Sequence, residues 1–282
     1  MPAEATERTT IQPPVLSQAC SVRNGSSTLS CVGTYTALSP RFAYVANELD
    51  NSVSTYVVDS VSGRLKWIAT VKAGDRPNSV TVDPLGRYAY VANTGSGDVS
   101  QYTIGIDGNL SQMAIAAVKA GYAPYSVTVA PSGRYVYVVN AGSDDVSQYT
   151  IAADGSLNPM VPATVKAGDG PQSLRVDPLG RYAYVVNYAS GDVSQYTIAA
   201  DGSLSQMVPA TVKTRDSSQS VTVDSSGRYI YVTSNSSHDV SQYTIAADGS
   251  LSAMNPSTVA SYLGPIDIVM TGDTSAVRAV PK

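Results

Sequence analysis

Charged residues are scarce in this chain of 282 residues, where Asp, Glu, Lys and Arg make up 14% against about 25% in an ordinary soluble domain. The formal net charge is −4, so no positive field is present to neutralise phosphates, and nucleic acid is not an expected partner. No stretch reaches the roughly 18 consecutive apolar residues that span a bilayer, and the first thirty residues lack the apolar centre of a signal peptide. We therefore expect no membrane insertion.

Histidine and cysteine are almost absent. The chain has one histidine, His238, and two cysteines, Cys20 and Cys31, which are too few for a metal cage, a Cys-x-x-Cys redox pair or a disulfide scaffold. We expect no metal site and no cofactor, and a single Cys20–Cys31 disulfide is left open. Of the 21 aromatic residues 19 are tyrosine, a bias that suits half-exposed strands and argues against a helical bundle.

An internal repeat organises what is there. The segment Gly-Arg-Tyr-Ala-Tyr-Val-Ala-Asn and its variants recur about every 47 residues, and their last positions are Asn47, Asn93, Asn140, Asn187 and Ser234. Repeats of 40 to 50 residues that are rich in short strands are typical of propeller blades, because a single four-stranded sheet cannot bury its own faces. The sequence predicts an all-β fold, a single β-propeller.

One unit shows how the blade is built. Residues 77–123 contain four strand-like pieces, at Ser79–Val82, Tyr88–Ala92, Asp98–Ile104 and Leu110–Val118. The turn Asp83-Pro84-Leu85-Gly86 has type I chemistry, and Asp107-Gly108 tolerates positive φ, so each joins two strands as a hairpin. The tyrosines that alternate with small residues in the second strand are expected to be core.

Six such units account for the chain. We place them at about 31–76, 77–123, 124–170, 171–217, 218–264 and 265–282, with the first recognisable strand near Thr34–Ala37. The last unit holds only two strands. We therefore expect the N-terminal extension, residues 1–30, to complete the C-terminal blade and close the ring, since an open ring would expose sheet edges.

The segments Tyr90-Val91-Ala92-Asn93 and Tyr137-Val138-Val139-Asn140, each followed by a polar turn and a Val-Ser-Gln-Tyr strand, resemble YVTN-type β-propeller repeats. The likeness covers about residues 31–282. It implies a surface-layer or secreted protein, hence an extracellular, periplasmic or cell-surface location, or a lactonase similar to 6-phosphogluconolactonase. Many members of that superfamily have seven blades, whereas this sequence counts to six. The motif specifies the fold and leaves the activity open.

Variation between the units concentrates in the loops from the fourth strand to the next first strand and from the second strand to the third, which share one face in a propeller. We call it the top face. One equivalent position there is Asn78, Tyr125, Gln172, Gln219 and Ile266, and another is Glu48, Thr94, Ala141, Tyr188 and Asn235. A copied framework has no need to vary there for stability, so function is expected on the top face.

Tyrosine gives a second argument for the top face. Four tyrosines that fall off the repeated strand positions map to top loops, namely Tyr122, Tyr125, Tyr188 and Tyr262. Tyrosine offers a large contact area at low entropic cost, as binding surfaces require, although packing over the pore mouth explains the same rings. With Asn78, Gln172 and Gln219 they are the predicted ligand-binding residues for a protein or glycan partner.

The catalytic alternative uses other residues. The lactonase resemblance implies a cluster of basic and acidic side chains that includes histidine, and here Arg76, Arg215, Glu48 and His238 could form it. No motif links them, and His238 is also explained as an incidental turn residue. The main hypothesis is a non-catalytic recognition module or scaffold. The alternatives are a lactone hydrolase acting at the pore mouth and a structural repeat unit, for which self-association is left open.

Two further periodic series admit a structural and a functional interpretation. The first is Asp98, Asp145, Asp192 and Asp239, which could supply calcium ligands or cap polar turns. The second is Lys72, Lys119, Lys166 and Lys213, which could form an anion-binding ring or simply end solvated strands. We favour turn capping for the first series and solvated strand ends for the second.

Overall fold

The computed structural model describes residues 19–21, 30–32 and 41–270 of the chain. Near the N-terminus β1 (Ala19–Ser21) pairs antiparallel with β2 (Ser30–Val32), with Cys20 opposite Cys31. Residues opposite each other in such a pair have Cα atoms about 4.5 to 5.5 Å apart, inside the range of disulfide bridges. The pairing is compatible with a Cys20–Cys31 disulfide, which stays a prediction.

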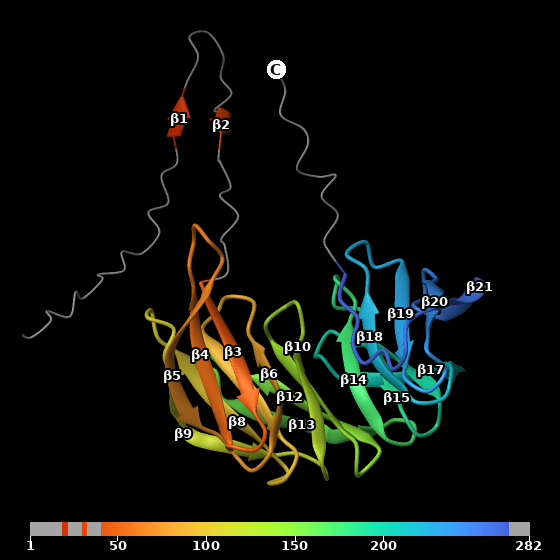
Figure 1. Ribbon diagram of the computed structural model, residues 1–282, viewed down its shortest axis with the longest axis horizontal. Coiled ribbons are helices and arrows are strands. Elements are labelled where there is room, and N and C mark those ends of the chain that lie inside the picture. Colours follow the sequence, from red (N-terminus) through yellow and green to blue (C-terminus); the bar gives the residue numbers. More distant parts are fainter. Residues whose placement is uncertain (1–18, 22–29, 33–40, 271–282) are drawn as a thin grey trace, which may run out of the picture.

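Residues 41–270 form strands and turns and contain no helix, hence no helix long and apolar enough to cross a membrane. The strands make five antiparallel sheets, which Figure 1 shows as an arc running from orange to blue. The first sheet is β3 (Phe42–Asn47), β4 (Ser52–Val58) and β5 (Leu65–Lys72). The second is β6 (Pro77–Val82), β7 (Tyr88–Asn93), β8 (Asp98–Ile104) and β9 (Leu110–Lys119).

The remaining sheets repeat the second one. The third sheet consists of β10 (Pro124–Val129), β11 (Tyr135–Asn140), β12 (Asp145–Ile151) and β13 (Leu157–Lys166). The fourth consists of β14 (Pro171–Val176), β15 (Tyr182–Asn187), β16 (Asp192–Ile198) and β17 (Leu204–Lys213). The fifth consists of β18 (Ser218–Val223), β19 (Tyr229–Ser234), β20 (Asp239–Ile245) and β21 (Leu251–Ala260). In each the strand order follows the sequence, and β6, β10, β14 and β18 are neighbours in turn. This is the predicted all-β propeller.

The blade count stays a prediction. Residues 41–270 give five sheets, and the expected strand near 34–37 lies outside the described residues, which leaves the first sheet with three strands. Residues 264–270 continue past the fifth sheet beside β18, where the Ser220 hydroxyl donates to Asp267. The rest of the sixth unit, 271–282, and most of the closing segment 1–30 also lie outside the described residues.

The core lies between neighbouring sheets. Between the third and fourth sheets the buried residues include Tyr137, Val139, Leu174, Val185 and Tyr196. Two neighbouring sheets bury the strand faces because residues that alternate along a strand point to opposite faces. Of the second-strand tyrosines predicted to be core, Tyr90, Tyr135, Tyr137 and Tyr184 are buried, whereas Tyr88, Tyr182, Tyr229 and Tyr231 are half-buried. Third-strand tyrosines such as Tyr196 are also buried.

Hydrogen bonds tie each blade to the next at fixed positions. At the junction of the third and fourth sheets, the Tyr137 hydroxyl donates to the Gly202 carbonyl at 2.6 Å, and the Tyr196 hydroxyl donates to the Lys166 carbonyl at 2.6 Å. The first of these bonds recurs in the pairs Tyr44–Gly108, Tyr90–Gly155 and Tyr184–Gly249. Burial raises the pKa of Tyr196 to about 12, so the hydroxyl keeps its proton and remains a donor.

At the two ends of the described residues, only one partner of this tyrosine–glycine contact is described. Gly63 stands at the corresponding turn of the first sheet, and no heavy atom lies within 4 Å of the place where its Cβ would be. In the fifth sheet the Tyr231 hydroxyl, the counterpart of Tyr137, has no hydrogen-bond partner among the described residues. Within the described residues, this contact therefore joins each of the five sheets to its neighbour.

Candidate functional site

A polar cavity of about 580 Å³ lies where the innermost strands meet. Its lining comes from β6, β10, β14 and β18 and from the segment 264–270 that follows the fifth sheet. Each inner strand contributes the residues that follow its first position. The cavity thus collects one short stretch from each of sheets two to five and one from the segment 264–270. A residue that differs between these stretches changes the chemistry of one part of the wall.

The predicted variable position converges on this cavity. Asn78, Tyr125, Gln172, Gln219 and Ile266 all line it. The Asn78 amide donates to the Tyr125 carbonyl at 2.8 Å, which links two neighbouring strands at this level. The amides of Gln172 and Gln219 make no hydrogen bond within the described residues and stay available to a ligand. Comparison between repeats placed these residues in loops of the top face, whereas the structure has the first four in the inner strands β6, β10, β14 and β18. Whether they bind a ligand stays a prediction.

Sequence analysis missed the cation of the cavity. Arg175 lines it from β14, at the position that Thr81, Thr128 and Thr222 occupy in the other inner strands. Its guanidinium donates to the Leu174 carbonyl at 3.0 Å, and the Thr128 hydroxyl of the neighbouring strand donates to the same carbonyl at 3.1 Å. The signal was present in the repeats, since one arginine stands where the other three complete units carry threonine.

The anion of the cavity was missed in the same way. Asp267 stands where the other inner strands have Ser79, Ser126, Ser173 and Ser220. One carboxylate oxygen of Asp267 accepts hydrogen bonds from the Ser220 hydroxyl and from the Ile268 backbone N–H at 2.8 Å. The other oxygen has no partner among the described residues. Hydrogen bonds thus fix Oδ1 of Asp267, whereas Oδ2 can accept a hydrogen bond or a proton from a ligand.

The other three predicted tyrosines do not line the cavity. Tyr122 packs its ring over the backbone of Gly142 and is 74% exposed, and Tyr262 is 95% exposed. Tyr188 is half-buried in the turn after β15. The Tyr122 N–H donates to the Ser143 hydroxyl at 3.0 Å, so the two kinds of top loop do lie together. Of the four tyrosines only Tyr125 lies with Asn78, Gln172 and Gln219.

The residues of the catalytic alternative are split between two places. Arg76 forms an ion pair with Glu48 at 2.7 Å, whereas Arg215 pairs with Asp239 at 3.4 Å. His238 accepts a hydrogen bond on Nδ1 from the Gly264 N–H at 3.0 Å, which fixes the loop before residues 264–270. None of the four lines the cavity. The structure brings Arg76 to Glu48 but does not assemble the predicted cluster.

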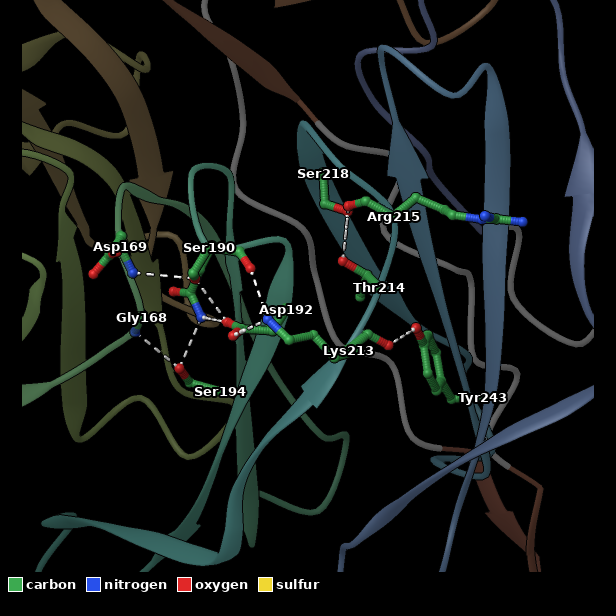
Figure 2. A network of polar contacts seen from close by, with 11 residues as sticks. Gly168, Asp169, Ser190, Asp192, Ser194, Lys213, Thr214, Arg215, Ser218 and Tyr243 are labelled. Atoms are coloured by element: carbon green, nitrogen blue, oxygen red, sulfur yellow. Dashed lines mark hydrogen bonds and ion pairs between the residues drawn. The ribbon is translucent and has the colours of Figure 1, made fainter.

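The periodic aspartates and lysines belong to the top loops. Figure 2 shows Asp192 accepting from the Ser190 hydroxyl at 2.9 Å and lying 3.5 Å from the Lys213 ammonium. The buried Asn187 amide donates to Asp192 and to Ser194, each at 2.8 Å. These contacts agree with the turn-capping interpretation. In the part of the chain that the structure describes, no group of three His, Cys, Asp or Glu side chains could hold a metal ion.

Comparisons with known proteins agree with the propeller. A stretch of 76 residues is 33% identical to a 6-phosphogluconolactonase of Pectobacterium carotovorum, and it spans 24% of this chain and only 23% of that relative. A solved candidate 6-phosphogluconolactonase of Bacteroides fragilis matches with a TM-score of 0.73 and 23% identity over 82% of this chain and 71% of its own. A periplasmic gluconolactonase of Pseudomonas aeruginosa matches with a TM-score of 0.65 and 24% identity over 74% and 66%.

These two structural matches are under 25% identical and therefore show the fold alone. The resemblance to lactonase propellers is confirmed by the family comparison that follows, whereas the assignment to YVTN-type repeats stays a prediction. The family model described as lactonase, 7-bladed beta-propeller, matches residues 41–275, which is most of the chain and includes the whole described cavity. The chain belongs to the lactonase family of seven-bladed β-propellers.

Proposed function

We propose that the protein hydrolyses a lactone in the central cavity. The observation that carries the proposal is that the two charged departures from the repeat, Arg175 and Asp267, line the same cavity in a member of the lactonase family. This proposal takes the lactonase alternative over the non-catalytic scaffold. It moves the reaction from the top-loop residues to the inner strands.

Arg175 is suited to stabilise the anion that forms during the reaction. Attack of water on the lactone carbonyl places a negative charge on the carbonyl oxygen of the tetrahedral intermediate. A donor already fixed at that oxygen is worth about 10² to 10³ in rate. The Arg175 guanidinium uses one N–H on the Leu174 carbonyl, which anchors it at the cavity wall, and it keeps further N–H donors for a ligand.

Asp267 is suited to take the proton of the attacking water. Its free carboxylate oxygen can accept that proton, while Ser220 and the Ile268 N–H hold the other oxygen in place. The water oxygen bonds to the carbonyl carbon, the ring C–O bond breaks, and the proton passes from Asp267 to the departing alkoxide. The product is an open-chain hydroxy acid. General base catalysis of this kind contributes about 10² to 10⁴ in rate.

The repeat itself supplies substitutions that should preserve the fold. Arg175→Thr and Asp267→Ser each install the residue that other blades carry at the same position. We expect each to lower the rate of lactone hydrolysis by about 10² or more, from the contributions above, with an unchanged melting temperature. Arg215→Ala and His238→Asn, outside the cavity, should keep the rate. If only Arg215→Ala and His238→Asn lose activity, the reaction takes place at the top loops and the proposed site is wrong.

A second candidate function is glycan or protein recognition by the top face. It is favoured by the exposure of Tyr122 and Tyr262, because rings with such large free area are typical of contact surfaces. A glycan array with the Tyr122→Ala and Tyr262→Ala variants tests it, and unchanged binding would remove these two rings as the ligand site. An extracellular, periplasmic or cell-surface location remains part of both proposals.

A further inference from the structure

The charges around the cavity bear on which lactone it would take. Among the described residues, 15 line the cavity, and of these Arg175 is the single cation and Asp267 the single anion. The described lining is therefore neutral. A phosphomonoester carries between one and two negative charges near neutral pH and is bound in proteins by several charge-assisted hydrogen bonds. Arg175 alone cannot donate these hydrogen bonds to a phosphate group and also donate to the carbonyl oxygen of the lactone.

Cations near the cavity are already engaged. Among the described top loops, Arg76 is paired with Glu48, Arg215 with Asp239, and Lys213 with Asp192. The periodic lysines end the outermost strands, three strands away from the inner strand of their own sheets. At about 4.8 Å per strand this puts them about 14 Å from the cavity wall. No surplus of positive charge faces the cavity within the described residues.

The uncharged part of the lining suits hydroxyl groups. Gln172 and Gln219 present amides without a hydrogen-bond partner among the described residues, and the Tyr125 hydroxyl likewise has none. An amide offers donors and acceptors side by side, which matches a hydroxyl that both donates and accepts. The Tyr125 ring, 37% exposed, adds a flat apolar face for the C–H surface of a sugar ring.

We infer, building on the proposed function, that the cavity selects an uncharged polyhydroxylated lactone over its phosphorylated counterpart. The amides of Gln172 and Gln219 read the ring hydroxyls, and Arg175 is reserved for the carbonyl oxygen. The neutral lining binds the polyol without desolvating an unpaired charge, whereas a phosphate would enter a site that cannot neutralise it.

Three lactones test the inference on the full chain: glucono-δ-lactone, its 6-phosphate, and δ-valerolactone, which has no hydroxyl groups. We expect kcat/KM for glucono-δ-lactone to exceed that for each of the other two at least tenfold. A Gln172→Leu, Gln219→Leu double variant should lose that preference over δ-valerolactone, through a fall in kcat/KM for glucono-δ-lactone. Gln112→Leu, the same exchange on the outer strand β9, is the matched control and should change neither.

A gain of function provides the converse test. Gln172→Arg adds a cation to the cavity wall and should raise kcat/KM for the 6-phosphate relative to glucono-δ-lactone by at least fivefold. If the 6-phosphate is the better substrate of the unmodified chain, or if the double glutamine variant treats all lactones as before, the inference is wrong and the proposed function stands. If no lactone is opened, the proposed function itself fails.

Discussion

Exchanging Gly202 for alanine tests how tightly neighbouring blades are joined. Gly202 has φ +86°, and a Cβ there would lie 2.3 Å from Cδ1 of the Tyr135 ring. The ring would have to leave its place, breaking the hydrogen bond from the Tyr135 hydroxyl to the Ala200 carbonyl at 2.8 Å and disturbing the bond from Tyr137 to Gly202. Each lost bond costs about 1 kcal/mol, and the exposed ring surface about 1 to 2 kcal/mol more.

Gly180 provides the control that separates this contact from backbone strain. It has φ +72°, yet no heavy atom lies within 4 Å of its missing Cβ. Alanine costs about 1 to 2 kcal/mol at either position because of the left-handed backbone. In urea unfolding we expect Gly202→Ala to be less stable than Gly180→Ala by about 3 to 4 kcal/mol. Equal losses in the two variants would refute the idea that the ring contact holds the blades together.

Two predictions concern ionisation and buried hydrogen bonds. Tyr196 donates to the Lys166 carbonyl and its pKa is raised to about 12, so its stabilising contribution is complete below pH 10 and lost as the pH rises through 12. Thermal melts should show Tyr196→Phe less stable by about 1 to 2 kcal/mol at pH 8, with the gap closing at high pH. The backbone N–H and hydroxyl of Ser203 lower the pKa of Asp201, whose contribution is therefore present above pH 4 and lost in more acidic solution. The melting temperatures of the wild type and Asp201→Asn should converge as the pH falls from 6 to 3; a constant gap would count against the turn cap.

The repeat made most of the fold readable from sequence. Strands such as Tyr135–Asn140 are predicted because polar turns, alternating tyrosines and a fixed spacing all point to one sheet. The number of blades was not readable in the same way, because identical junction residues are compatible with rings of different size. The expectation of six blades rested on chain length divided by the period.

The site was only half predicted, for a physical reason. Asn78, Gln172 and Gln219 were found because their position takes four different residue types in five repeats. Arg175 and Asp267 instead depart from positions that hold mostly Thr and Ser. A search for variable columns passes over single exceptions. The grouping of Arg215 with Arg76 failed because it rested on residue types, and the structure satisfies each arginine locally with an acid.

The identical junctions between neighbouring blades have an evolutionary meaning. Every inner junction is built from the same atoms, so nothing in a junction records its place in the order of blades. Duplicating or deleting one 47-residue unit would therefore leave all remaining interfaces intact. The number of blades can then change, while each remaining inner strand keeps the residues that it contributes to the cavity wall.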